Sequence, residues 1–109
     1  MRIEDVPFAT VEWDRVSAVP HPGETGTALW RTIEVGNIRV RKVEYSAGYL
    51  ADHWCQRGHV LLVLQGELVT ELGNGESRIL KAGDSYHVAD GAMPHRSRTD
   101  AGAKLFIVD

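Results

Sequence analysis

The chain has 109 residues, of which 43% are hydrophobic and 25% charged, a composition typical of one ordinary globular domain. Its formal net charge of -3 at pH 7 provides no broad positive field, so we expect no nucleic-acid partner. The longest apolar run, residues 60–64, is too short to cross a bilayer, and the N-terminus carries acids where a signal peptide is basic and then apolar. These features predict a cytoplasmic protein with no membrane partner.

The first part of the chain lacks a periodic pattern. Prolines and glycines interrupt residues 1–26, so we expect an irregular N-terminal arm with one strand at most. His21 lies between two prolines and is expected to be a loop residue. Residues 27–109 consist of short segments rich in β-branched and aromatic residues, separated by turns that contain glycine. They predict a single all-β domain.

The turns of this domain can be placed in chain order. Gly36 and Asn37 separate two such segments and predict a hairpin with a two-residue turn. Gly58 and Gly66 are expected to mark bends or turns between short strands, and the Gly-Asn-Gly run at 73–75 predicts a second hairpin. Evenly spaced antiparallel strands favour a sandwich or jelly roll, in which two sheets close on one another. Further strands are expected at 77–80, 85–88, 95–99 and 104–108.

Residues that commonly bind metals are concentrated in one short stretch, at His53, Cys55 and His59. If residues 53–55 form a strand, the alternation of side chains places the imidazole of His53 and the thiol of Cys55 on the same face. Gly58 can bend the backbone so that His59 approaches them from the start of the next strand. The spacing is neither that of a helical zincin nor that of a zinc finger.

The same stretch resembles the first cupin motif, G(x)5HxH(x)3-4E(x)6G, whose histidines and glutamate bind a metal. His53 lies at the first histidine of the motif, Cys55 at the second and His59 at the glutamate. Gly66 lies at the closing glycine, and Gly48 is one residue nearer than the leading glycine. The resemblance covers residues 40–108 and implies an all-β double-stranded β-helix, the jelly-roll barrel of the cupins.

The segment from Gly83 through Gly91 to His95 resembles the second cupin motif, G(x)5PxG(x)2H(x)3N. His95 lies at the remaining metal histidine, although Ala89 replaces the usual proline and three residues separate Gly91 from His95. More narrowly, residues 52–59 together with residues 94–97 and the ending at 103–109 resemble a small cupin subgroup named for an Asp-His-Cys-Trp motif. The resemblance implies a metal site made of His53, Cys55, His59 and His95.

Three imidazoles and one thiolate form a soft ligand set, which suits transition metals and disfavours magnesium and calcium. Zinc or iron is therefore the first expectation for a divalent cofactor, and nickel or copper is also compatible. A bound ion would keep Cys55 deprotonated. In the alternative interpretation Cys55 is a packing residue or an oxidisable thiol, and the site shrinks to three histidines.

Several polar and aromatic residues near the motifs have simpler interpretations. By strand alternation His87 points away from the pocket, while Tyr86 is a candidate for its lining. The alternating Arg39 and Arg41 are expected on a solvated strand face or in salt bridges, with a substrate contact as the alternative. Trp54 is expected to pack on the outer face of the sheet or in a dimer interface.

The sequence leaves three functions open. The cupin resemblance implies a metal-dependent enzyme, dioxygenase-like or isomerase-like, that acts on a small polar molecule. No catalytic residue is assigned, because the motifs do not place Glu44, Asp52 or Glu67 as a general base. The alternative is a non-catalytic module that binds a small ligand or acts as a sensor and holds a structural metal, and a third interpretation is a metal-free barrel. The apolar residues 60–64 further predict a homodimer.

Overall fold

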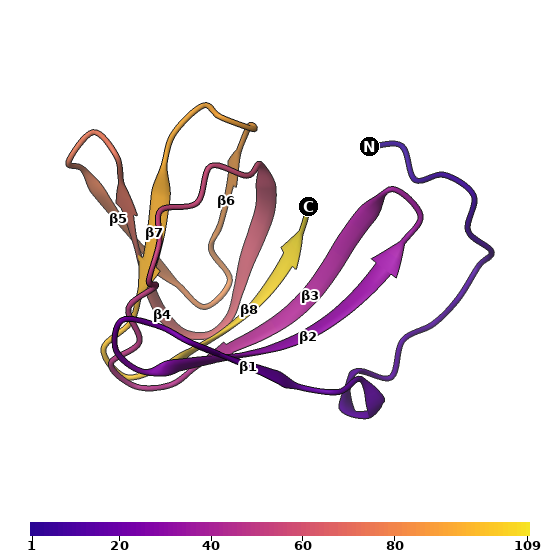
Figure 1. Cartoon of the computed structure of the whole chain (residues 1–109), viewed down its shortest axis with the longest axis horizontal. Coiled ribbons are helices and arrows are strands. Elements are labelled where there is room, and N and C mark those ends of the chain that lie inside the picture. Colours follow the sequence, from indigo (N-terminus) through magenta and orange to yellow (C-terminus); the bar gives the residue numbers. More distant parts are fainter.

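Eight strands and one turn of 3-10 helix follow one another along the computed structural model, which describes all 109 residues (Figure 1). All pairings between the strands are antiparallel, which confirms the all-β prediction. The chain contains no helix with the length and apolar character that a membrane span requires. The elements are η1 (Trp13–Arg15), β1 (Val19–Pro22), β2 (Thr27–Val35), β3 (Ile38–Tyr45), β4 (His59–Leu72), β5 (Ser77–Lys81), β6 (Ser85–Val88), β7 (His95–Arg98) and β8 (Ala103–Val108).

Strand β4 belongs to two sheets and thereby builds a barrel. Its first half pairs with β6 and β8, and its second half pairs with β5 and β7. Beyond β8 the order of neighbours continues through β3 and β2 to β1. Figure 1 shows β4 bending between these two groups, with β5 and β7 on one side of the interior and β2 and β3 on the other.

The bend of β4 lies at Gly66. Its φ of +82° is in the left-handed region, and a Cβ atom there would lie 2.3 Å from the carbonyl oxygen of Gly102. A shift in register between Val63 and Gln65 accompanies the bend. The prediction that Gly66 separates two strands is therefore wrong, because the glycine instead lets one strand bend and pass from sheet to sheet.

Both predicted hairpins are confirmed. Val35 pairs with Ile38, so that residues 36–37 form the two-residue turn between β2 and β3. Residues 73–75 lie in the connection between β4 and β5, which pair from Glu67 to Glu71. The turn chemistry of the sequence thus fixes the register of four of the eight strands.

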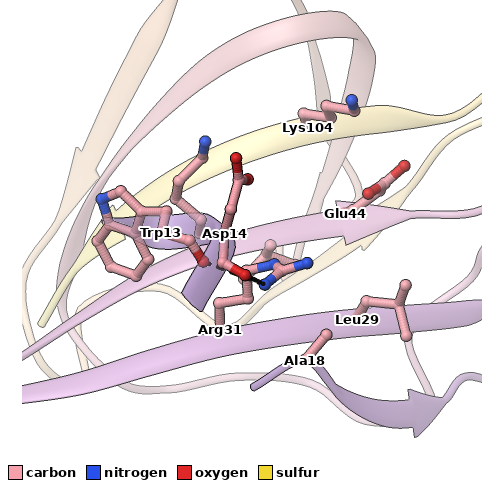
Figure 2. A pocket seen from close by; sticks show the side chains of 9 residues that line it. Trp13, Asp14, Ala18, Leu29, Arg31, Glu44 and Lys104 are labelled. Carbon is pink, nitrogen blue, oxygen red and sulfur yellow. Dashed lines mark hydrogen bonds between the residues drawn. The ribbon is translucent and has the colours of Figure 1, made fainter. Parts of the chain in front are cut away.

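The N-terminal elements contact β2. β1 pairs with β2, and the ring of His21 in β1 stacks on Trp30 with 3.9 Å between the ring centroids. His21 is therefore a strand residue and not a loop residue. Arg31 Nη1 donates to the carbonyl oxygens of Trp13 and Val16, which ties η1 to β2 across a hollow of about 280 Å³ (Figure 2). Arg31 therefore has a structural role, because it connects the two elements that border this hollow.

The interior of the barrel contains an apolar core. Its largest fully buried side chains are Leu61, Val63, Leu68 and Leu105, each at most 1% exposed. They come from β4 and β8, the strands at the centre of the sheet order. Burying one such leucine contributes on the order of 2 kcal/mol, so these residues supply much of the stability.

The inward face of β3 is partly polar. Arg41 is only 6% exposed and lies on the same face as Val43 and Tyr45, which are both buried. The expectation that Arg41 lies on a solvated strand face is wrong for this residue. The physical reason is the period of the strand, since residues 41, 43 and 45 share one face and two of the three are apolar.

Candidate metal centre

The segment that carries Cys55 is not a regular strand. Residues 52 and 53 form a bend, and Cys55 makes only an isolated bridge with His95. In that bridge the amide of Cys55 donates to the carbonyl of His95 at 2.7 Å, and the amide of His95 donates back at 3.0 Å. The strand alternation that placed His53 and Cys55 on one face therefore does not apply. The bridge instead brings Cys55 beside the second cupin motif.

Gly58 positions the next candidate ligand. Its amide donates to Asp90 Oδ1 at 2.6 Å, and a Cβ atom on Gly58 would lie 2.7 Å from the amide nitrogen of Asp90. Only glycine permits this close approach of two backbones. Strand β4 then begins at once with His59, whose register partner is Val88 at the end of β6. The bend predicted at Gly58 lies instead at residues 52–53, and the role of Gly58 is this close approach to Asp90.

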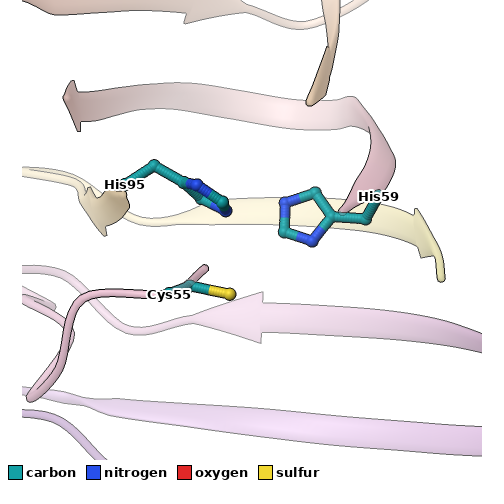
Figure 3. A group of neighbouring side chains, drawn as sticks. All are labelled: Cys55, His59 and His95. Carbon is teal, nitrogen blue, oxygen red and sulfur yellow. The ribbon is translucent and has the colours of Figure 1, made fainter. Parts of the chain in front are cut away.

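Cys55, His59 and His95 converge on one point (Figure 3). One ligand atom from each residue lies within 4.8 Å of the other two. Bonds from zinc to nitrogen and to sulfur are about 2.0–2.3 Å long, so two ligands of a tetrahedral ion lie about 3.3–3.6 Å apart. The three donor atoms would have to move inward by up to about 1 Å, which rotation of the side chains can supply, to bind a single ion.

The imidazole of His95 is held in one tautomer. Its Nδ1 lies 2.8 Å from the carbonyl oxygen of Met93, which can only accept, so Nδ1 carries the proton. Nε2 consequently has a free lone pair, and this atom is buried without any hydrogen-bond partner. A carbonyl on the far nitrogen is the usual orienting contact of a metal-binding histidine.

The imidazole of His59 also has one unused nitrogen. Nε2 lies 2.9 Å from the hydroxyl of Tyr86, while Nδ1 is buried, has no hydrogen-bond partner and lies 3.7 Å from Asp109 Oδ2. Burial, and then the neighbouring His95, lower the pKa of His59 to about 4. The ring is therefore neutral near pH 7, which is the form that binds a metal.

These three residues fit a transition metal. Two buried imidazole nitrogens without partners are costly in a folded protein unless something binds them. The third donor is the sulfur of Cys55, which accepts a hydrogen bond from the amide of Arg57 at 3.4 Å. Two imidazoles and one thiolate suit zinc, iron, nickel or copper and leave further coordination positions for a water or a substrate.

The structure does not bring His53 to this group. Its side chain is 69% exposed, and Nδ1 donates to Asp52 Oδ1 at 2.7 Å. His53 is among the residues that line the neighbouring cavity, but it is not one of the three whose donor atoms converge. Of the four predicted ligands, three converge and His53 faces solvent. His87 is also exposed, as the alternation of β6 indicates.

A cavity of about 370 Å³ opens next to the three converging residues. Its lining is aromatic and cationic, includes Tyr45, Tyr49 and Tyr86, and contains no aspartate or glutamate. Burial raises the pKa of Tyr86, so its hydroxyl stays protonated and acts as a hydrogen-bonding group beside His59. Tyr86 was expected in the lining, and the structure confirms this position.

Sequence reasoning missed two residues of the cavity region. Arg57 lines the cavity, and Asp109 lies beneath it with a side chain that is 1% exposed. Asp109 belongs to the ending that carries the subgroup resemblance, but that resemblance gave it no role. It follows the last strand, and its burial depends on pairing between β3 and β8. The burial of Arg41, in contrast, could have been predicted, because it lies two residues before Val43 and therefore on the same inward face of β3.

Solved structures of known proteins have the same barrel. The chain is similar to an ectoine synthase from P. lautus, with 15% identity and a TM-score of 0.75, over 93% of this chain and 76% of that one. It is similar to a sugar phosphate isomerase of the cupin superfamily from Silicibacter pomeroyi, with 17% identity and a TM-score of 0.69, over 92% and 74% of the two chains. An RmlC-like cupin from Shewanella frigidimarina matches with 19% identity and a TM-score of 0.67, over 87% and 83%.

These similarities establish the fold. No protein-family model matches the sequence, and no curated protein matches it. At such low identities the shared feature is the barrel, which carries different functions in different proteins. The chain thus has a cupin β-barrel fold, with a group of one cysteine and two histidines in its interior that can hold a metal ion.

Proposed function

We propose that this protein is a metal-dependent enzyme that acts on a small polar molecule, with the metal held by Cys55, His59 and His95. The observation that carries the proposal is the convergence of these three donors beside an open cavity, with one buried nitrogen of each imidazole left without a partner. Three protein ligands and an open position are typical of catalytic metal sites, whereas four protein ligands close a structural one.

When bound, the metal would act as a Lewis acid that polarises an oxygen of the substrate. The chain's own residues would orient this centre. The carbonyl of Met93 fixes the tautomer of His95, and the Tyr86 hydroxyl holds the ring of His59. The aromatic side chains of the cavity would limit access of water. Zinc or iron is the first candidate for this metal. We further propose that the protein is a member of the Asp-His-Cys-Trp subgroup.

A second candidate function is a non-catalytic module that binds a small ligand through the same metal. The observation in its favour is that no carboxylate lines the cavity. Acid–base chemistry commonly needs a side chain whose pKa lies near the working pH, and Tyr86 is held protonated. A binder needs no such group.

Metal content tests the site. Elemental analysis of protein purified without added metal should find stoichiometric metal in the wild type and in His87→Ala, the control on an exposed histidine. Cys55→Ser, His59→Ala and His95→Ala should each lose it, with folding checked by circular dichroism. Metal retained in all three variants would contradict the proposal.

Turnover separates the enzyme from the binder. The metal-loaded protein would be mixed with small organic acids and sugars while oxygen consumption and heat release are followed. Heat that continues with product formation, and that His95→Ala abolishes, supports an enzyme. Saturable binding heat without product in every case supports the binding module instead.

A homodimer in the cytoplasm is a further part of the proposal. Val60 and Leu64 of β4 and Ile79 of β5 are 49%, 42% and 65% exposed, respectively. Such apolar side chains would be covered by a second copy. Light scattering coupled to size-exclusion chromatography should then give twice the mass of 12.1 kDa.

A further inference from the structure

Three arginines surround one buried carboxylate beside the candidate metal centre. Arg39 binds both oxygens of Asp109, with Nε at 2.8 Å from Oδ1 and Nη2 at 3.0 Å from Oδ2. Arg41 Nη2 lies 3.0 Å from the same Oδ2, and Arg57 Nε lies 3.8 Å from it. Arg39 therefore contacts both oxygens of the carboxylate, while Arg41 and Arg57 both lie near only one of them, Oδ2.

The side-chain charges of this region do not balance. Three guanidinium groups lie near the one side-chain carboxylate of Asp109, and no acidic residue lines the cavity itself. A divalent ion bound by one thiolate and two neutral imidazoles would add another net positive charge. Of these arginines only Arg41 is buried, and it shares its one counter-ion, Asp109, with Arg39, so an anion from outside the chain would complete its pairing.

Arg41 is the fixed member of this group. It is 6% exposed, lines the cavity, and its Nε is buried without a hydrogen-bond partner. Its guanidinium stacks on Trp30, with 4.5 Å from Cζ to the ring centroid, which holds its plane. An oriented guanidinium with unused donors is the side chain best suited to bind a planar oxyanion.

Arg57 is the adjustable member. Its side chain is 54% exposed, it lines the same cavity, and its guanidinium makes no hydrogen bond. It belongs to the segment between Cys55 and His59, so its backbone is tied to two of the proposed metal ligands. A ligand in the cavity can therefore meet Arg41 from inside the barrel and Arg57 at the mouth.

We propose that Arg41 and Arg57 form a carboxylate-binding subsite beside the metal centre, and that the small molecule taken by the cavity is an organic acid anion. The inference rests on the proposed function in one respect: the metal would bind the part of the acid next to its carboxylate. The arginines would bind the carboxylate itself. Two arginines suit a carboxylate and a phosphate alike, so inorganic phosphate is the competing anion that the experiment has to distinguish.

The test is a titration of the full chain with propionate, followed by NMR at the Nε–Hε resonances of the arginines. The neutral isostere propionamide, sodium chloride and inorganic phosphate serve as parallel titrants at constant ionic strength. We expect saturable shifts of the Arg41 and Arg57 resonances with propionate and none with propionamide. Equal shifts with propionate and chloride would overturn the subsite, and binding of phosphate without propionate would overturn the carboxylate assignment.

Variants assign the binding to these residues. Arg57→Gln and Arg41→Lys should each weaken propionate binding about tenfold, the effect of losing one charge-assisted hydrogen bond. Arg78→Gln, a control on an exposed arginine that pairs with Glu76, should bind propionate as the wild type does. Arg57 is largely exposed, so its variant tests the inference even if Arg41→Lys does not fold. Unchanged affinity in Arg57→Gln would contradict the subsite.

Metal content measured in the same samples separates this inference from the proposed function. Propionate binding in protein that takes up no metal would contradict the metal centre and leave the subsite standing. Stoichiometric zinc in protein that shows no propionate binding would contradict the subsite and leave the metal centre standing. The titration is therefore run on both metal-free and zinc-loaded protein.

Discussion

Two parts of the barrel interior contain opposite chemistry. Around Val63, Leu68 and Leu105 the side chains are apolar and almost fully buried. Around Arg41 and His95 the side chains are as inaccessible, yet they include polar atoms without partners. The first part stabilises the chain in its own right, whereas the second part is satisfied only when a ligand supplies the missing contacts. Stability and binding should therefore respond separately to mutation.

The largest effect is expected in the apolar part. Leu105→Ala removes a side chain that is 0% exposed, and the cavity left behind should lower the free energy of unfolding by about 2–5 kcal/mol. Urea denaturation measures this loss. Leu64→Ala, on a side chain that is 42% exposed, is the control and should cost much less. Loss of the metal from folded Leu105→Ala would show that the two parts are not independent.

A similar but conditional effect is expected in the polar part. Zinc at a free concentration of 100 times its Kd should stabilise the wild type by about 2.7 kcal/mol, because it binds only the folded chain. Thermal unfolding with zinc and then with a chelator measures the difference. In His95→Ala the zinc-dependent rise in Tm should vanish, while the control His87→Ala keeps it. An equal rise in both variants would place the zinc elsewhere.

A smaller effect concerns an ion-pair network on the strands that carry the site. Glu71 of β4 accepts from Arg96 and Arg98 of β7, with the shortest contact at 2.7 Å. The hydrogen bonds from Arg96, then the charges of both arginines, outweigh burial and lower the pKa of Glu71 below its ordinary value of 4.5. A carboxyl with a lowered pKa stabilises the fold above its unfolded pKa, and this contribution is lost as the pH falls through the folded pKa.

Glu71→Gln should therefore reduce stability near pH 7 by up to about 1 kcal/mol and flatten the loss of stability below pH 4.5. Urea denaturation at pH 7 and at several acidic values measures both. Glu67→Gln on the same strand is the control, because Glu67 makes no ion pair. If Glu71→Gln and Glu67→Gln follow the same pH dependence, the network does not carry the effect.

The sequence predicted the fold well because its signals are local. The turn at Gly36 and Asn37 and the strands at 77–80 and 85–88 each depend on neighbouring residues, and the structure has them as expected. Gly66 was predicted to end a strand, whereas strand β4 continues through it. Only the close approach of Gly102, which is distant in sequence, shows this. Glycine marks a change of direction in the sequence without stating whether the strand stops.

The site was predictable only in part because its contacts are distant in the chain. Cys55 and His59 come from the first motif and His95 from the second, and the structure brings all three together. The bridge between Cys55 and His95 sets the local backbone, so alternation along residues 53–55 did not describe it. Asp109 was missed because its role depends on arginines of β3 that are far away in sequence.

The smallest effect is expected for substitution of His53. This substitution tests whether His53 is a metal ligand. Because its side chain is 69% exposed and paired with Asp52, His53→Ala should keep stoichiometric metal and change the free energy of unfolding by less than about 0.5 kcal/mol. Elemental analysis beside His59→Ala checks this. Loss of metal from His53→Ala would show that the segment before β4 rearranges to bring a third imidazole to the ion. The centre would then have four protein ligands, which favours a structural metal over a catalytic one.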